Sequence, residues 1–412
     1  MQLKVTKNLL QDTLPSPYWI LTNVSAYVIY LSQKLKQHPL RLIVCILLGI
    51  LFLSSSVFSN SKTSDSILED QVGQILLVGF RGTEITDNSP FAKMLYELNL
   101  GGVVLFDYDV PTQSFPRNIL DAEQTQKLVA DLQKSAKTPL LVAVDAEGGR
   151  INRLKKKYGF LQIPSAQEMG TKSYLECLNI YRTLAHQLQA LGFNLNLAPV
   201  VDLNLNPQNP VIGSLERSFS EDPQRVAECA SAFITAHREN NLITTLKHFP
   251  GHGSSREDSH LGLVDISRTY KSLELQPYRD LIQKNLVATI MTAHIMNRKI
   301  DPKFPATLSK EFIQSLLRDK LAFQGVVISD DMQMGAITEN FGFAEALILA
   351  INAGCDLIAL ANNAKTYDDV LPLRAHQIIV EAVNTGNISR QRIEEANTRI
   401  KRLKTKYGIL NQ

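Results

Sequence analysis

From Gln71 onward, short apolar runs rich in β-branched residues alternate with stretches whose apolar residues are spaced three and four apart. The runs have the length and composition of buried strands and lie at 74–80, 102–106, 139–145, 193–203, 243–249, 288–295, 325–330 and 355–360. Eight strands alternating with helices predict an α/β fold, a single (β/α)8 barrel of the TIM type. An open doubly wound sheet is the alternative, but no glycine-rich phosphate-binding fingerprint follows the first run.

Ionisable residues stand at the ends of several of these runs. They are Asp145, Asp202, Lys247, His248, His294 and Asp330. In a (β/α)8 barrel the carboxyl ends of the strands meet at one face, and active sites lie on that face. The sequence therefore predicts that these side chains converge on a single pocket.

Charge and cysteine content exclude some classes of function. The chain has 43 Lys and Arg against 40 Asp and Glu, a net charge of +3, which gives no electrostatic reason to expect a nucleic-acid partner. No CxxC pair occurs among the four cysteines, Cys45, Cys177, Cys229 and Cys355. We expect buried free thiols rather than a disulfide framework or a zinc knuckle.

One N-terminal segment is long enough to cross a membrane. Residues 42–61 form a stretch of twenty residues without charge, preceded by Lys34, Lys36 and Arg41. The positive-inside rule predicts that the N-terminus stays in the cytoplasm and that the rest is exported. Cleavage near Ser59 would make the segment a signal peptide and the protein secreted, although the long preceding region favours an uncleaved anchor. A buried core helix is the remaining alternative.

The expected organisation of the chain follows from these features. Its segments are a cytoplasmic N-terminal segment at 1–41, a transmembrane anchor or signal segment at 42–61, a linker at 62–71 and one catalytic barrel domain at 72–412. The polar linker composition is typical of flexible connections. The oligomeric state is not indicated by any pattern in the sequence.

The stretch LKHFPGHGSSREDSH, residues 246–260, follows the fifth run and contains three of the eight histidines. Asp258 and His260 can hydrogen-bond if the loop bends locally. A carboxylate on one imidazole nitrogen would fix the tautomer and leave the other nitrogen to transfer a proton near neutral pH. An ordinary solvated loop histidine is the alternative for His260.

The same histidines raise the possibility of a metal site. His248, His252, His260 and Asp330 could supply ligands to a metal-dependent hydrolase. The histidines are spread over a Pro-Gly turn instead of along one helix face or strand. We therefore expect no metal ion and no cofactor.

The run GVVISDDM ends in two adjacent carboxylates. Neighbouring side chains on a strand point to opposite faces, so Asp330 and Asp331 cannot both face one substrate atom while the strand persists. Asp330 is expected to enter the pocket as a nucleophile or electrostatic stabiliser. The alternative is that both aspartates cap the following helix.

Arginines follow the third and fourth runs. VDAEGGRINR supplies Arg150 and Arg153, and NPVIGSLERSF supplies Arg217, with forked donors suited to hydroxyl, carboxylate or phosphate oxygens. Taken alone, each arginine could equally be a surface residue. LKKKYG, residues 154–159, is expected to be a solvated charge run.

Together these motifs resemble the glycoside hydrolase family 3, in particular its single-domain β-N-acetylhexosaminidase branch, from about Gly73 to Gly408. The resemblance is carried by VDAEGGRINR, APVVDLNLNPQNPVIGSLERSF, KHFPGHGSSREDSH, DPKFPATLS and ISDDMQM. It implies that Asp330 is the nucleophile and His260 the general acid/base, with Asp258 as its partner. It also implies a sugar subsite lined by Asp145, Arg153, Arg217, Lys247 and His248.

The resemblance implies a retaining hydrolase with a covalent glycosyl-aspartate intermediate. The implied substrate carries a non-reducing terminal β-linked N-acetylglucosamine, and peptidoglycan fragments in the cell envelope would suit an exported enzyme. Substrate-assisted catalysis is disfavoured because it needs a carboxylate pair that adjacent strand residues would not supply. The alternatives are a β-glucosidase, a phosphorylase of the same family, or a non-catalytic glycan-binding barrel.

Overall fold

Eight parallel strands pair in the order β11-β9-β7-β6-β3-β2-β1-β12, so that each strand lies beside its neighbours in the sequence. The two ends of this sheet meet where Ile328 forms a parallel bridge with Leu357, and the sheet is thereby nearly closed into a barrel. The computed structural model describes residues 66–259 and 262–411. The described residues from Ile67 onward form one unit. The (β/α)8 prediction is confirmed for this part of the chain.

All eight predicted strand positions are occupied. The barrel strands are β1 (Leu76–Gly79), β2 (Gly102–Leu105), β3 (Leu141–Val144), β6 (Leu195–Asn196), β7 (Ile243–Phe249), β9 (Thr289–Thr292), β11 (Val326–Ile328) and β12 (Ile358–Leu360). The run at 193–203 pairs regularly only at β6, because Pro199 has no amide hydrogen to donate to a neighbouring strand. Every residue of β1, β2 and β3 is buried, as expected for strands covered on both faces.

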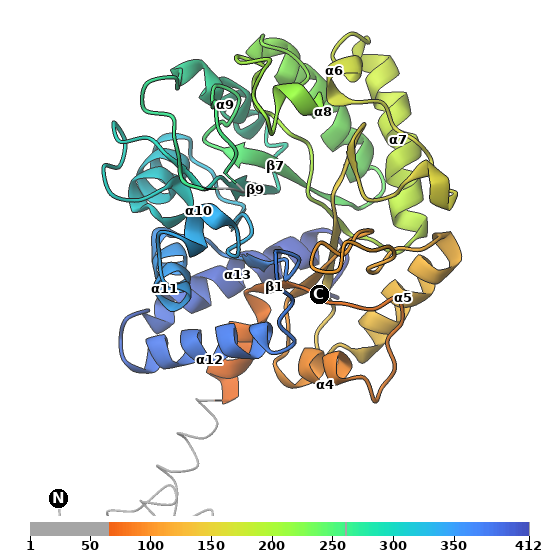
Figure 1. Ribbon diagram of the computed structural model, residues 1–412, viewed down its shortest axis with the longest axis vertical. Coiled ribbons are helices and arrows are strands. Elements are labelled where there is room, and N and C mark those ends of the chain that lie inside the picture. The colour runs from red at the N-terminus through yellow and green to blue at the C-terminus, as the bar shows by residue number, and fades with distance from the viewer. Residues whose placement is uncertain (1–65, 260–261, 412) are drawn as a thin grey trace, which may run out of the picture. The chain divides into compact units, whose positions relative to one another are not determined.

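Helices surround the strands (Figure 1). The longer ones are α4 (Pro90–Glu97), α5 (Ala122–Ser135), α7 (Tyr174–Ala190), α8 (Pro223–Arg238), α9 (Gln276–Gln283), η5 (Glu311–Lys320), α11 (Phe343–Ala353), α12 (Leu371–Asn384) and α13 (Arg390–Lys406). One of these, η5, is a π-helix, although its apolar residues have the three-and-four spacing of an ordinary helix. Two short helices, α6 (Ala166–Met169) and α10 (Gly335–Thr338), follow β5 and β11.

Short strands and 3-10 helices lie in the loops between the barrel strands and the helices. Hairpin β4 (Ala146–Gly148) with β5 (Ile151–Asn152) follows β3, and β8 (Val264–Asp265) pairs with β10 (Ile295–Met296). Single turns of 3-10 helix are η1 (Lys156–Tyr158), η2 (Gly213–Leu215), η3 (Ser272–Leu275) and η4 (Ala306–Leu308). Ile151 of β5 and Leu215 of η2 line the cavity at this end of the barrel.

The N-terminal predictions fall largely outside the described residues. This holds for the segment at 42–61, for the cytoplasmic segment at 1–41 and for Cys45. Residues 66–74 are helical and bury Leu68 and Val72, so helical structure begins within the stretch expected to be a linker. Within 66–259 and 262–411, no helix is both long and apolar enough to span a bilayer. Cys177, Cys229 and Cys355 are buried free thiols, as predicted.

Helix α13 closes the amino-terminal end of the barrel. Asp356, directly before β12, is fully buried and accepts hydrogen bonds from Arg318 and Arg392, each at 2.7 Å. It also accepts a hydrogen bond from the Val327 amide at 3.0 Å. This carboxylate therefore ties β11, β12 and α13 together at the seam of the barrel.

A buried lysine of α13 makes the stability of the barrel depend on pH. The Lys404 ammonium is buried and donates to the Gln74 side chain and the Pro139 carbonyl. Among residues 66–259 and 262–411 it forms no ion pair, and burial lowers its pKa from 10.5 to about 7. Between pH 7 and 10.5 the unfolded chain binds more protons than the folded one, so this contribution to stability rises with pH in that window.

Lys404→Met is therefore expected to change the free energy of unfolding in a pH-dependent way. The free energy of unfolding of the variant, relative to that of the unmodified protein, should be higher at pH 6 than at pH 9 by about 2–3 kcal/mol. Urea unfolding of both proteins at the two pH values measures this difference. Lys401→Met, at an exposed position of the same helix, is the control and should show no such change. An equal effect of Lys404→Met at both pH values would contradict the prediction.

Candidate active site

A cavity of about 370 Å³ opens at the carboxyl ends of the barrel strands. Seven of the eight predicted site residues line it: Asp145, Arg153, Arg217, Lys247, His248, Asp258 and Asp330. They come from distant parts of the sequence, and the barrel brings them together as predicted. The eighth, His260, lies outside the described residues. Arg150 is exposed and is not among the lining residues.

One wall of the cavity is a cluster of alternating charges. The buried Lys247 ammonium lies 2.8 Å from Asp145 Oδ1 and 2.7 Å from Glu147 Oε1. Arg217 forms a two-pronged pair with Glu147, with Nε–Oε2 at 2.8 Å and Nη2–Oε1 at 2.7 Å. Arg153 completes the cluster, 3.6 Å from Asp145. The wall presents fixed donors and acceptors to a polar ligand.

The charges in this wall keep one another ionised. Burial alone would raise the pKa of Asp145, but Lys247 and Arg153 hold that pKa below its usual value. The pKa of Glu147 is likewise lowered, because Arg217 and Lys247 outweigh the effect of its burial. For Lys247, burial would lower the pKa, yet Asp145 and Glu147 raise it. The wall is therefore charged across the neutral pH range.

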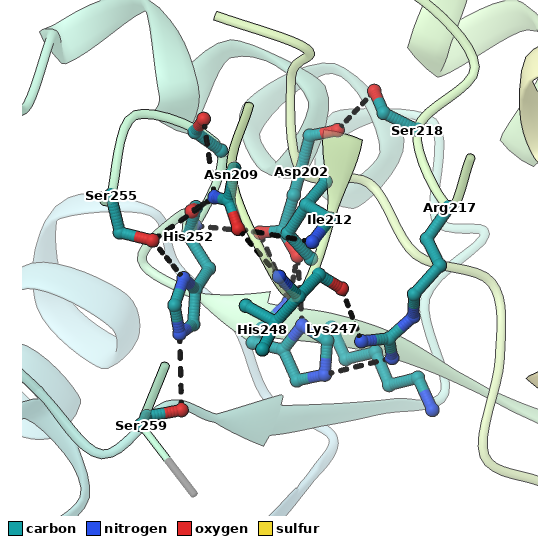
Figure 2. A network of polar contacts seen from close by, with 12 residues as sticks. Asp202, Asn209, Ile212, Arg217, Ser218, Lys247, His248, His252, Ser255 and Ser259 are labelled. Carbon is teal, nitrogen blue, oxygen red and sulfur yellow. Dashed lines mark hydrogen bonds and ion pairs between the residues drawn. The ribbon is translucent and has the colours of Figure 1, made fainter. Parts of the chain in front are cut away.

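His248 lines the cavity and lies between a carboxylate and an arginine (Figure 2). Its Nδ1 lies 2.7 Å from Asp202 Oδ2, and its Nε2 lies 3.4 Å from Arg217 Nη2. Asp202 is fully buried and also accepts the backbone amides of His248 and His252. Burial would raise the pKa of Asp202, but the two histidines lower it. Asp202 thus fixes the orientation of the His248 ring.

The loop after β7 is held in place by buried polar contacts. His252 Nδ1 lies 2.7 Å from Ser255 Oγ, and its Nε2 lies 3.1 Å from Ser259 Oγ. The buried Glu274 carboxylate accepts hydrogen bonds from the Gly253 amide and the Ser254 hydroxyl. A Cβ on Gly253 would lie 1.7 Å from the Leu203 carbonyl oxygen, so only glycine fits there. The loop therefore leaves β7 along a fixed path before it reaches Asp258.

His252 has a structural role in this loop. Both of its ring nitrogens face serine hydroxyls, and burial lowers its pKa to about 4, which keeps the ring neutral. The ring nitrogens of His248 likewise face Asp202 and Arg217. In residues 66–259 and 262–411, no group of three or more His, Cys, Asp or Glu side chains is arranged to hold a metal ion.

Asp330 and Asp331 both line the cavity, which corrects the expectation from strand geometry. Strand β11 ends at Ile328, so the alternation of side chains has ceased before the two aspartates. Neither is the N-cap of α10, which begins after Met334. Asp331 Oδ1 accepts the amides of Gln333 and Ala361, at 3.2 and 3.0 Å. Asp331 therefore holds the turn that places Asp330.

One buried acid of the site, Glu147, was missed in the sequence, and the role of Asp202 as the partner of His248 was not predicted. Glu147 joins Arg217 to Lys247, and Asp202 orients His248. Glu147 stands two residues after Asp145 in an extended segment, so the two carboxylates lie on the same side, and this spacing could have identified it. Asp202 was noted only as a strand-end residue, because its partners come from another strand.

We expect Glu147→Gln to weaken substrate turnover without removing a group that lines the cavity. Charge-assisted hydrogen bonds of this kind contribute about 1.5–3 kcal/mol, so kcat/KM should fall by about 10- to 100-fold. Steady-state kinetics measure the change in kcat/KM, and urea unfolding measures any change in the free energy of unfolding. Glu239→Gln, at an exposed pair with Arg182, is the control and should change neither quantity appreciably. An unchanged kcat/KM in Glu147→Gln would show that turnover does not depend on the charge cluster.

Comparison with known proteins agrees with this geometry. The chain matches the N-terminal domain of glycosyl hydrolase family 3 over residues 67–403. It is 36% identical over 297 residues to a protein named Beta-hexosaminidase from Tolumonas auensis, covering 70% of this chain and 83% of that one. A Beta-hexosaminidase from Idiomarina loihiensis is 35% identical over 299 residues, which cover 70% of this chain and 84% of the relative.

Solved structures give the same result. A family 3 beta-N-acetylglucosaminidase from a Paenibacillus species superposes with a TM-score of 0.75 at 33% identity. That match covers 83% of this chain but only 62% of the Paenibacillus chain. Beta-N-acetylhexosaminidase from Beutenbergia cavernae superposes with a TM-score of 0.70 at 29% identity, covering 82% of this chain and 98% of that one. The chain belongs to glycosyl hydrolase family 3.

Proposed function

We propose that this protein is a retaining β-N-acetylhexosaminidase that removes non-reducing terminal β-linked N-acetylglucosamine. The observation that carries the proposal is the single cavity that collects Asp330, Asp258 and the charged wall around Lys247. The similar proteins named Beta-hexosaminidase and beta-N-acetylglucosaminidase support the same reaction class. No metal or cofactor takes part in the proposed reaction.

In the proposed mechanism Asp330 attacks the anomeric carbon and forms a covalent glycosyl-aspartate. His260 donates a proton to the leaving oxygen and then takes a proton from the incoming water, and Asp258 is its partner. An imidazole suits both roles because it titrates near neutral pH without deep burial. Asp258 lines the cavity from the loop that leads to position 260.

The sugar would be held by the other five predicted site residues that line the cavity, namely Asp145, Arg153, Arg217, Lys247 and His248. Carboxylates accept hydrogen bonds from sugar hydroxyls, and the ammonium and guanidinium groups donate to sugar oxygens. Because these groups are already paired, and are buried or half-buried, they need little reorganisation when the substrate binds. The same preorganisation stabilises charge that develops at the ring in the transition state.

Catalysis assisted by the substrate's own acetamido group is the main mechanistic rival. It needs a second carboxylate free to hold that group, and Asp331 is the neighbouring candidate. Asp331 Oδ1 is already engaged by two backbone amides, which favours a structural role. The covalent route through Asp330 is therefore preferred.

We further propose that residues 42–61 anchor the chain in a membrane, with the catalytic domain outside the cytoplasm, or serve as a cleaved signal. The charge distribution around that stretch supports the orientation. Peptidoglycan fragments would then be the accessible substrate. Fractionation of cells that express the full chain should place activity in the membrane or envelope fraction. Activity confined to the cytoplasmic fraction would refute the proposed anchoring or export of the chain.

The activity itself is tested with a chromogenic β-N-acetylglucosaminide and the full chain. We expect turnover that is unchanged by a chelator and by added phosphate, and much weaker turnover of the matching β-glucoside. Faster turnover of the glucoside would identify a β-glucosidase, and release of a sugar phosphate would identify a phosphorylase. Binding of glycans without any turnover would identify a non-catalytic glycan-binding barrel and refute the proposal.

A further inference from the structure

Two buried thiols lie together between helices α7 and α8, which pack side by side (Figure 1). Cys177 stands near the start of α7 and Cys229 stands in α8, and both side chains are fully buried. Cys177 Sγ lies 3.3 Å from the Met169 carbonyl oxygen, and Cys229 Sγ lies 3.9 Å from the same oxygen. The two thiols also hydrogen-bond to each other. We call Cys177 and Cys229 the thiol pair.

The packing of the two helices keeps these thiols adjacent. Tyr181 and Phe233 stand four residues after Cys177 and Cys229, and their ring centroids lie 4.7 Å apart. Residues four apart lie on the same face of a helix, so α7 and α8 run parallel with two contacts in matching register. A disulfide bond spans only a short distance between two backbones. Two cysteines whose thiols already touch across packed helices are placed for that short span.

The thiol pair lies behind the segments that lead to the charged wall of the cavity. The carbonyl that accepts both thiols ends α6, and the Gln167 amide of α6 donates to the Glu216 carbonyl at 3.2 Å, directly before Arg217. Arg225, at the start of α8, donates from Nε to the Gly170 carbonyl at 2.9 Å. A covalent link between α7 and α8 would therefore brace both segments from behind without entering the cavity.

Burial makes the thiol pair unreactive once the chain has folded. It raises the pKa of both thiols, that of Cys229 to about 12, and the attack of a thiol on a disulfide needs the thiolate. Before the two helices pack, both thiols have their ordinary pKa and are open to solvent. A bond between them would therefore form while the chain folds, and the packed helices would then protect it from reduction.

We propose that Cys177 and Cys229 are the site of a disulfide bond that joins α7 to α8 when the chain folds in oxidising surroundings. The inference does not depend on the sugar chemistry, and the export proposed above would supply such surroundings. One thiolate attacks a small disulfide such as glutathione disulfide and releases one glutathione, and the other thiolate then attacks the mixed disulfide and releases the second. The protein thereby loses two electrons and two protons, which leave with the two glutathione thiols.

The test is cell-free synthesis of the full chain with a mild detergent, once in a mixture of reduced and oxidised glutathione and once in dithiothreitol. In the glutathione mixture we expect a protease digest to contain one peptide pair linked through Cys177 and Cys229. The midpoint of thermal unfolding should lie roughly 3–6 °C above that of the reduced protein, because the link restricts a long stretch of the unfolded chain.

Cys177→Ala and Cys229→Ala should each abolish this difference in midpoint between the two preparations. Cys355→Ala is the matched control, because it removes another buried thiol, one that donates to the Thr307 carbonyl at 3.6 Å. This variant should keep the full difference. Should an alanine variant not fold, the peptide map of the unmodified chain decides alone.

Several results would overturn the disulfide site. They are free alkylation of both cysteines after synthesis in the glutathione mixture, a lasting glutathione adduct on one of them, and a link from either to Cys45 or Cys355. A linked protein with a lower midpoint than the reduced protein would show that the packed helices do not accept the bond. None of these measurements uses a sugar substrate, so they are independent of whether the hexosaminidase assignment holds.

Discussion

Replacement of Asp330 by alanine is expected to abolish hydrolysis while leaving the fold intact. The carboxylate lines the cavity and comes from the turn after β11, and no other residue of that turn is proposed to attack the sugar. Loss of a nucleophile that forms a covalent intermediate should lower kcat on the order of 10⁴-fold or more. Steady-state kinetics with an aryl N-acetylglucosaminide and urea unfolding of the same variant measure activity and stability side by side.

Asp331→Asn is the matched control for this experiment. Asparagine keeps a side-chain oxygen that can accept the Gln333 and Ala361 amides, so the turn should survive and most of the activity should remain. If Asp331→Asn were the inactive variant and Asp330→Ala retained turnover, the roles of the two aspartates would be reversed. Hydrolysis at the rate of the unmodified protein in Asp330→Ala would rule out a covalent mechanism through this residue.

His260→Ala is expected to slow both chemical steps by about 10²–10⁴-fold, since the imidazole is proposed to act first as acid and then as base. The loss should be smaller for substrates whose leaving group needs no proton, such as a dinitrophenyl glycoside. Azide, a nucleophile that needs no base, should restore turnover of such a substrate and yield a glycosyl azide. These signatures report the proton transfer and not merely the loss of a side chain.

The control for His260→Ala is His186→Ala, at an exposed position of α7, which should retain full activity. Asp258→Asn should show a milder form of the same defect, because it leaves the imidazole in place but removes its charged partner. An equal loss for good and poor leaving groups in His260→Ala, without rescue by azide, would rule out the acid/base role.

The barrel was predictable because its strands are buried on both faces. Runs such as ITTLKHF and GVVISD are rich in apolar and β-branched residues, and this composition can be recognised without knowing which strands pair. The run at 193–203 was predicted too long, because a proline in its middle limits regular pairing to Leu195–Asn196. The apolar spacing of η5 fits an α-helix equally well, so the sequence did not indicate that this helix is a π-helix.

The site was predictable only in part, because sequence shows which residues end a strand but not which residues they meet. Asp145, Lys247 and Asp330 were found from their positions at strand ends. The contacts of Glu147, in hairpin β4–β5, with Lys247 and Arg217 join segments far apart in the sequence, and no local pattern indicates them. The alternation argument that separated Asp330 from Asp331 does not apply to them, because the strand stops at Ile328, two residues before the pair.

The most direct test of the central claim is to trap the glycosyl-enzyme. A 5-fluoro-N-acetylglucosaminyl fluoride forms the intermediate but releases it slowly, and digestion followed by mass spectrometry locates the attached sugar. We predict one sugar per protein, attached to Asp330, and none in Asp330→Ala. A sugar attached to another residue, or turnover of the reagent through an oxazoline without any protein adduct, would contradict the account.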